Sequence, residues 1–486
     1  MLRKTSVATA VLVALSSLTV QAEGYKLLEQ SVSSMGNAYA GRGAQITDAT
    51  LVYSNPAALT ELKGEHFSGG LNLIHARTRY SDAQAVNARG LEVTGRDHGK
   101  VLLTEVVPFA FYSQQLNDDL SWGLGFYVPF GLSSNYQQDW VGRYFADETA
   151  VQILSLQPAL GYKLTDWLSV GGAISLNRAE GTLSKYKDHS GLCELGSGIA
   201  QLAGRDLSNA AFCDSHYEVT GSDVSLGYTL ALHAEPLSGT RLALIYHSAV
   251  RYTLSGDSEI TNTPITAATA GNTPGLISVA PGLPLVDAST GRFAARDLLT
   301  ERSKLALTTP ATLTFSLDQQ LNAKLSVQGS LLWTGWSVFK SIDIVSKDAN
   351  PSISPSTGAQ LGGAGYIGYI PEYWHDTWSF SLGATYQYQA DLTLRAGIAY
   401  DENPIRTVHK TARIPTSDRI WLTTGLTTRL SAQSTLDLAY GYMFMDDVAI
   451  NEFEYGVADN RLNQANLQAN YSNKAHVLGV QFNYQF

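Results

Sequence analysis

The chain has 486 residues, of which 44% are hydrophobic and only 16% are Asp, Glu, Lys or Arg, whereas soluble globular proteins carry about 25% charged residues. An aromatic content of 10% excludes an intrinsically disordered chain, and the lack of any run of about 20 apolar residues after residue 22 excludes a helical membrane bundle. The formal net charge of −10 argues against a nucleic-acid partner.

Residues 1–22 have the pattern of a secretory signal peptide. Arg3 and Lys4 give a basic start, an apolar stretch follows, and the segment ends on a small-x-small sequence at 20–22. A membrane anchor is the alternative, but the apolar stretch is short and is interrupted by serines. We therefore expect export with cleavage after this segment.

Residues 23–64 show no sustained alternation and are rich in small residues, so they do not read as barrel wall. We call this segment the hatch. Leu27, Met35 and Val52 within it argue against a disordered periplasmic tail. Because small residues allow close backbone packing, we expect the hatch to fold into a barrel lumen as a plug.

From residue 65 onward the dominant pattern has a period of two. In 120–130 every even position is large and apolar, and small or polar residues dominate the odd positions. A helix cannot produce this pattern. Half-buried strands of a water-soluble sandwich are the alternative. The scarce charge and the aromatic strand ends favour strands that face lipid, where only a closed barrel satisfies every backbone group.

Fourteen such segments predict an all-β, 14-stranded antiparallel transmembrane barrel over 65–486. The predicted strands are 66–80, 100–115, 118–131, 149–164, 166–182, 222–236, 239–254, 302–320, 322–340, 374–390, 391–403, 416–431, 434–448 and 472–486.

The connections between these strands alternate between tight turns and long segments. This alternation places tight turns in the periplasm and long loops outside the cell. The two longest loops, about 183–221 and 255–301, contain apolar residues that should face water. Such patches usually bind something, so we expect these loops to capture a ligand; packing on one another as a lid is the alternative.

Pro129 stands inside the third predicted strand. Proline has no N–H to donate to a neighbouring strand, so it normally marks an edge or a bulge. We expect an interruption of the wall at this position. The alternative is that Pro129 sits at the outer rim, where strands end in any case.

Cys193 and Cys213 are the only cysteines, and both lie in the loop after the fifth strand. An exported protein meets an oxidising compartment, where a disulfide is allowed. We predict that the two residues form one, which would close a loop of about 20 residues; two unpaired thiols are the alternative.

The last predicted strand alternates up to Phe486, the final residue. A terminal aromatic after a full alternating strand resembles the assembly signal of an outer-membrane barrel, so we expect the barrel-assembly machinery to be a partner. A soluble strand that closes a sandwich is the alternative.

Several sequence blocks resemble the FadL family of outer-membrane long-chain fatty-acid transporters, whose relatives include aromatic-hydrocarbon channels. The blocks are LEQSVSSMGNAYAG (28–41), SNPAALT (54–60), FGL (130–132), PEYWHDTWSFSLGATYQY (371–388), LTLRAGIAYDENPI (392–405) and IPTSDRIWLTTGLT (414–427).

The resemblance implies a barrel closed by the hatch that takes hydrophobic molecules up passively. A long acyl chain gains about 0.8 kcal/mol per buried methylene, so a continuous apolar path suits such a ligand. The family pattern implies capture by the two long loops and a pocket that involves the mature N-terminus. It also implies lateral release through a wall opening. The corresponding residues here are Glu23, Gly24 and Tyr25 for the pocket, Asn55, Pro56 and Ala57 for the hatch tip, and Val128, Pro129, Phe130 and Gly131 for the lateral opening.

A carboxylate ligand would also need a cation near its head group. Lys185, with Tyr186 beside it, matches the position of a basic residue that the family uses near its pocket, and His375 stands where relatives carry a lysine. Ordinary solvated side chains are the alternative for both positions. Lys185 favours fatty acids over aromatic hydrocarbons as the substrate.

No sequence pattern indicates an enzyme. The chain has no G-x-S-x-G elbow, P-loop, H-E-x-x-H or cysteine-rich metal motif, so we expect no catalytic residue, cofactor or metal. We expect a monomer in the bacterial outer membrane, in contact with outer-membrane lipid. A general diffusion porin is the remaining alternative, and the hatch argues against it.

Overall fold

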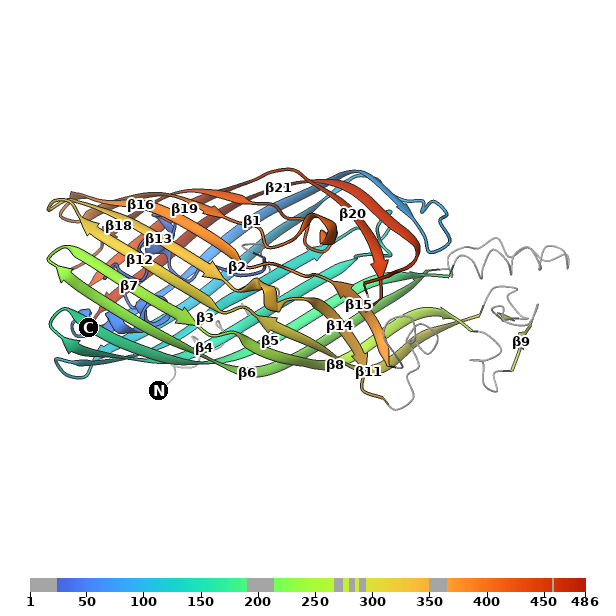
Figure 1. Cartoon of the computed structure of the whole chain (residues 1–486), viewed down its shortest axis with the longest axis horizontal. Coiled ribbons are helices and arrows are strands. Elements are labelled where there is room, and N and C mark those ends of the chain that lie inside the picture. The colour runs from blue at the N-terminus through green and yellow to red at the C-terminus, as the bar shows by residue number, and fades with distance from the viewer. Residues whose placement is uncertain are drawn as a thin grey trace, which may run out of the picture.

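The computed structural model describes residues 24–189, 214–265, 274–278, 285–287, 294–348, 365–456 and 459–486. In these ranges the chain forms one closed antiparallel barrel of fourteen passes, with the hatch inside it (Figure 1). The predicted fold class is therefore confirmed. None of the helices in the described part has the length and hydropathy that a membrane crossing needs.

Nine passes are single strands, and five are built from two strand segments each. The single strands are β1 (Glu65–Val86), β2 (Gly99–Gln115), β3 (Leu120–Asn135), β4 (Glu148–Thr165), β5 (Leu168–Asp188), β6 (Asp214–Leu237), β17 (Leu392–Asp401), β18 (Arg419–Arg429) and β21 (Arg461–Gln485). The divided passes are β7 (Thr240–His247) with β8 (Val250–Pro264), β11 (Ala295–Thr309) with β12 (Thr312–Gln320), β13 (Leu325–Thr334) with β14 (Ser341–Ser346), β15 (Tyr366–Pro371) with β16 (Thr377–Gln389), and β19 (Ser434–Met445) with β20 (Val448–Tyr455).

The barrel closes where the first strand meets the last. β1 pairs with β2 on one side and with β21 on the other, from His66 opposite Gln485 to Val86 opposite Asn466. The C-terminus lies at the end of the barrel that carries the tight turns, at the left of Figure 1. Outside the wall, β9 (Leu276–Ile277) and β10 (Val286–Asp287) form a separate two-stranded sheet.

The outer surface carries the alternating apolar side chains that the period of two predicts. On β6, Leu226 is 67% exposed and Leu230 is 58% exposed, whereas Thr229 and Ala231, the two neighbours of Leu230 in the chain, are buried. These apolar side chains would be unfavourable in water and are matched to the hydrocarbon of a bilayer. Above them Arg178 and Glu180 form an exposed ion pair on β5, which marks the outer limit of the apolar belt there.

The strands extend further than the predicted loop borders. β5 continues to Asp188 and β6 starts at Asp214, and these two residues lie opposite each other in the ladder. On the next hairpin β8 continues to Pro264 and β11 begins at Ala295. Beyond the membrane the outward face of a strand no longer meets lipid, so its outward positions need not be apolar and the alternation that revealed the strands is lost there.

The hatch is almost completely buried within the barrel. Its elements are α2 (Val32–Met35), α3 (Leu51–Ser54) and the 3-10 helix η2 (Pro56–Glu61). α2 packs on β18, β19, β21 and β1, and η2 packs on β2 to β6, so the segment touches the wall on several sides. Asn55 fixes the turn into η2, because its side chain accepts from the Ala57 N–H and donates to the Gly43 carbonyl.

Two wall glycines allow the hatch to approach the barrel backbone. A Cβ atom at Gly397 on β17 would lie 2.2 Å from the Asn37 carbonyl carbon, and one at Gly171 on β5 would lie 2.2 Å from the Ala57 nitrogen. Neither distance is compatible with a side chain. The small-residue content of the hatch is thus matched by small residues in the wall that it contacts.

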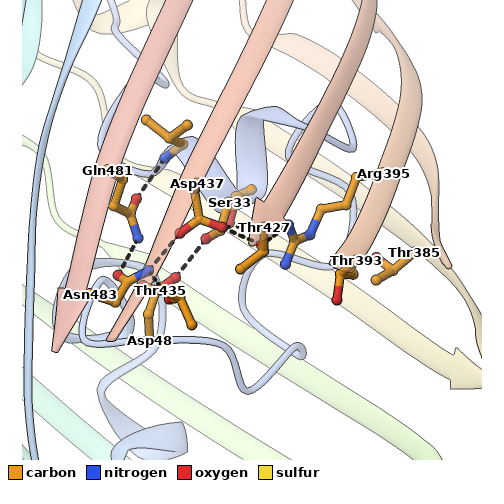
Figure 2. Close-up of polar contacts among 12 residues, drawn as sticks. Ser33, Asp48, Thr385, Thr393, Arg395, Thr427, Thr435, Asp437, Gln481 and Asn483 are labelled. Atoms are coloured by element: carbon orange, nitrogen blue, oxygen red, sulfur yellow. Dashed lines mark hydrogen bonds and ion pairs between the residues drawn. The ribbon is translucent and has the colours of Figure 1, made fainter. Parts of the chain in front are cut away.

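A polar network ties the hatch to the strands next to the barrel closure (Figure 2). The Val32 N–H at the start of α2 donates to Gln481 on β21, and Gln481 donates to Asn483. Asn483 donates to Asp437 on β19, which also lies 3.6 Å from the buried guanidinium of Arg395. Because Asp437 and Arg395 lie beside each other, neither charge is buried alone, and the network fixes the start of α2 against the wall.

Candidate functional site

The wall has a break between β2 and β3. These strands pair only between Ala110–Gln115 and Ser121–Phe126, whereas β2 residues 99–109 pair only with β1. On its other side β3 stays paired with β4, with a bulge between Tyr127 and Phe130 that contains Pro129. The upper half of β3 therefore has a free edge toward β2.

The start of the hatch occupies this free edge. Lys26 bridges to Phe130, the Leu27 N–H donates to the Pro129 carbonyl at 2.9 Å, and the Gly131 N–H donates to the Tyr25 carbonyl at 2.9 Å. Residues 25–27 thus form a short extra strand on β3. We call these three residues the edge segment.

An aromatic cluster holds the edge segment in place. The Tyr25 ring lies 4.9 Å from Trp336 and 5.9 Å from Trp374, measured between centroids, and it also contacts Phe130 and Phe339. Gly24 has a φ of +64°, and a Cβ there would meet the Trp374 ring at 2.6 Å. Glycine is therefore required for the chain to turn into this cluster.

An apolar cavity of about 50 Å³ lies beside Tyr25, and we call it the inner cavity. Aliphatic side chains from β3, β4, β5, β6, β8, β11 and β14 line most of it, including Leu132 on the half of β3 that does not pair with β2. The two charged residues in its lining are Glu372, between β15 and β16, and Arg413, in the segment before β18.

Each of these two charged residues has an unused polar atom. Arg413 donates to the carbonyls of Glu148 and Ser184 and to the Thr149 hydroxyl, but its Nε has no hydrogen-bond partner. Glu372 accepts from the Trp374 indole N–H through Oε2, and its Oε1 has no partner. Burial raises the pKa of the Glu372 carboxyl to about 8. At neutral pH a protonated acid and a guanidinium therefore face an apolar space.

A larger cavity of about 420 Å³ opens above the inner one, and Leu183 and Arg413 line both. We call it the outer cavity. Lys185 lies in its wall but forms a 2.7 Å ion pair with Glu454. Lys187, also in the lining, has its Nζ 4.9 Å from the centre of the Tyr217 ring. The outer cavity is thus amphipathic, with cations beside aromatic and aliphatic surface.

The predicted site residues fall in different places. Tyr25 lines the inner cavity, Gly24 packs against the rings of Trp336 and Trp374, and Lys185 and Tyr186 line the outer cavity. His375 is in the lining of neither cavity; its Nε2 is 3.8 Å from Glu402. The bulge and free edge of β3 contain Val128, Pro129, Phe130 and Gly131. The start of η2, far along the hatch from the edge segment, contains Asn55, Pro56 and Ala57. Three predicted residues lie outside the described ranges: Glu23, Cys193 and Cys213.

Sequence reasoning missed Glu372 and Arg413 as site residues. Glu372 stands in a block that carries the family resemblance and Arg413 directly precedes another, but they are far apart in the chain and neither lies on an alternating strand. An available signal was Glu372 itself, because it is an acid between a proline and two aromatic residues in IPEYW (370–374).

Glu372 is expected to make the barrel less stable as the pH rises. Burial raises the pKa of its carboxyl from 4.5 to about 8, so between these values the folded protein keeps a proton that the unfolded chain has released. The free energy of unfolding then falls with rising pH, by about 1.4 kcal/mol per pH unit at most. Glu372→Gln should match the native protein in urea midpoint at pH 4.5 and exceed it at pH 9.

The control for this comparison is Glu402→Gln, which alters a partly exposed acid nearby. Unfolding can be followed by tryptophan fluorescence in urea. The contributions of all other titrating groups to the pH dependence of stability cancel when a variant is compared with the native chain. Parallel pH profiles for Glu372→Gln and the native chain would contradict the assignment of a buried neutral acid.

Comparison with known proteins gives concordant matches. The family model described as outer membrane protein transport protein (OMPP1/FadL/TodX) matches residues 13–486. An outer membrane protein of Neisseria meningitidis serogroup B is 27% identical over 97% of this chain and 97% of its own. The long-chain fatty acid transport protein of Escherichia coli O6:H1 is 27% identical over 99% of this chain and 98% of its own. The crystal structure of a Pseudomonas aeruginosa FadL homologue has a TM-score of 0.78 at 23% identity, and the match covers 95% of this chain and 100% of that one.

Proposed function

This chain belongs to the OMPP1/FadL/TodX family of outer membrane transport proteins, and from that membership we propose that it takes up long-chain fatty acids and releases them sideways into the membrane. The predicted family and outer-membrane location are confirmed by the match. The family consists of transporters, so the chain is an outer-membrane transporter of hydrophobic molecules and not an enzyme.

The observation that carries the fatty-acid proposal is the composition of the two cavities, which share Leu183 and Arg413 in their linings. The inner cavity offers an apolar lining for an acyl chain, and at its junction with the outer cavity stands Arg413 with an unused Nε. A guanidinium in a dry site binds a carboxylate strongly. An aromatic hydrocarbon would leave the Nε of Arg413 and the Oε1 of Glu372 without a partner, which argues against that substrate class.

The sizes of the cavities suggest the order of events. The outer cavity, at about 420 Å³, lies within the range of roughly 300–1,000 Å³ that is usual for small-molecule sites. The inner cavity, at about 50 Å³, does not. A long acyl chain therefore enters the inner cavity only if Tyr25 and the rest of the edge segment move.

Lateral release follows from what surrounds the inner cavity. The hatch is buried against the wall below and blocks a vertical route. At the side, the edge segment lies along the free edge of β3, and two backbone hydrogen bonds attach it to the strand. Displacement of the edge segment would open the wall between β2 and β3 toward the membrane.

Because the protein recognises a carboxylate, we expect palmitate to bind more tightly than hexadecane, which has the same chain length but no carboxylate. Both would compete for the purified protein with a fluorescent fatty-acid analogue. A hydrogen bond to a charged group contributes about 1.5–3 kcal/mol, so palmitate should bind roughly ten- to a hundredfold more tightly than hexadecane. Arg413→Met should remove most of this difference without changing hexadecane binding.

The matched control is Arg96→Met, which removes an exposed arginine that pairs with Asp139 in a loop. Each variant must keep the heat-modifiable migration of a folded barrel. Equal displacement by palmitate and hexadecane in the native protein would refute the fatty-acid proposal and favour the hydrocarbon channel.

A further inference from the structure

Four cations gather on the outer face of three neighbouring strands at the barrel closure. Arg77 on β1 lies opposite Lys474 on β21, and Arg79 on β1 lies opposite Lys100 on β2. We call these four residues the basic patch. The basic patch is on the outside of the barrel, whereas both cavities are inside it. Its proposed role is therefore distinct from transport.

The alternation of each strand places the four side chains on the outside. On β1 the inward positions Ile74 and Tyr80 are fully buried, whereas Leu71, at the same parity as Arg77 and Arg79, is 40% exposed. Lys474 shares its parity with the exposed Leu478 on β21, and Lys100 shares its parity with the exposed Leu102 on β2. All four residues therefore project toward the membrane and its surface.

The basic patch has no counter-charge of its own among the described residues. None of the four cations forms an ion pair within 4.0 Å there. Asp82, an exposed acid above the patch, accepts from Ser81 and Asn470. Like charges directly opposite each other on neighbouring strands are destabilising, and here two such pairs lie side by side. An external anion would remove this repulsion.

The height of the basic patch on the wall indicates where that anion comes from. Along the β1 and β21 ladder the outward pairs are Phe67 with Tyr484, Gly69 with Phe482, Leu71 with Val480, Leu73 with Leu478, His75 with His476 and then Arg77 with Lys474. From Phe67 to Arg77 the strand rises roughly 25 Å, at about 3.3 Å per residue and a tilt of about 40°. This distance is the height of the apolar band of such barrels, so the patch lies at the level of the outer head groups.

We propose that the basic patch binds the phosphate groups of an outer-leaflet lipid, whose acyl chains lie on the apolar side chains directly below. The two cation pairs suit a lipid that carries two phosphates, because each phosphate can rest between one opposed pair. Leu71, Leu73, Leu478 and Val480 supply the adjoining apolar surface. A free phosphate ion would use the cations but not this surface.

The test uses the full-length mature chain, purified and freed of lipid in an uncharged detergent. Binding of diphosphorylated lipid A is measured by native mass spectrometry and by the rise in the temperature at which the heat-modifiable form is lost. The native protein should bind this lipid at least tenfold more tightly than the Arg79→Gln, Lys474→Gln double variant. Monophosphorylated lipid A should bind with intermediate affinity.

Arg251→Gln with Lys304→Gln is the matched control, because these exposed cations on β8 and β11 also face outward but do not lie opposite each other. It should bind diphosphorylated lipid A as the native protein does. Equal weakening in both double variants would overturn the proposal, since it would reflect net charge alone. Release of the lipid by low millimolar inorganic phosphate would overturn the assignment to a lipid. If the patch double variant does not fold, Arg79→Gln and Lys474→Gln are compared singly, each with an expected loss of at least threefold.

Discussion

A disulfide between the edge segment and β3 should stop fatty-acid uptake almost completely, and reduction should restore it. Lys26 and Phe130 are the residues to replace by cysteine. They form an antiparallel bridge flanked by the hydrogen bonds of Leu27 to Pro129 and of Gly131 to Tyr25. In such a non-hydrogen-bonded pair the Cα atoms lie about 4.5 Å apart, which a disulfide can span.

The measurement is uptake of a labelled long-chain fatty acid by cells that carry the variant, before and after a reductant. Cys193 and Cys213 are replaced by serine in the background, so that no other thiol competes. The single variants Lys26→Cys and Phe130→Cys, treated with the same oxidant, control for the loss of either side chain. Undiminished uptake through the locked protein would exclude this edge of β3 as the exit.

Deletion of hatch residues 24–62 is expected to turn a protein with little ion conductance into a steady ion channel. The hatch fills the lumen, and nearly all of its residues are buried there, so its removal leaves a water-filled passage of the width that fourteen strands enclose. Conductance across a planar bilayer should rise from near background to that of an open porin. The full-length protein in the same assay should conduct little.

The barrel itself should survive this deletion. β1 and β21 close the wall through their own ladder, which involves no hatch residue, so the deleted form should still show heat-modifiable migration. A folded deletion variant that stays non-conducting would show that another segment blocks the lumen. Large steady channels from the full-length protein would instead support a general diffusion porin.

The membrane-facing wall was predictable because lipid imposes a strict chemical alternation. On β6 the outward positions from Val224 to Leu232 are all large and apolar, and such a pattern has one structural interpretation. The same logic explains where prediction failed. Above the belt, where Lys185 on β5 lies opposite Tyr217 on β6, the outward face no longer meets lipid, and the outward positions 214–222 of β6 carry polar residues, so the large apolar residues that mark a strand are missing.

The site was predictable only in part, because it depends on register and on distant contacts. Pro129 indicated an interruption in β3, and the bulge is there. The proline does not reveal that pairing with β2 ends at Phe126, since register is a property of two strands. Nor does any local pattern reveal that Arg413 and Glu372 share one cavity, because only the closed barrel brings them together.

The contacts of the hatch also determine which part of the wall resists mechanical stress. The closure between β1 and β21 is reinforced from inside on both sides, since Asn72 of β1 donates to the Glu29 carbonyl and Gln481 of β21 accepts from Val32. In the described part of the chain, the hatch holds the upper edge of β3 through the two backbone hydrogen bonds of the edge segment and one from the Gln30 side chain to the Val128 carbonyl, with no strand of the wall paired there. Under lateral tension the hatch thus acts as an internal brace for one joint, and the wall yields at the other.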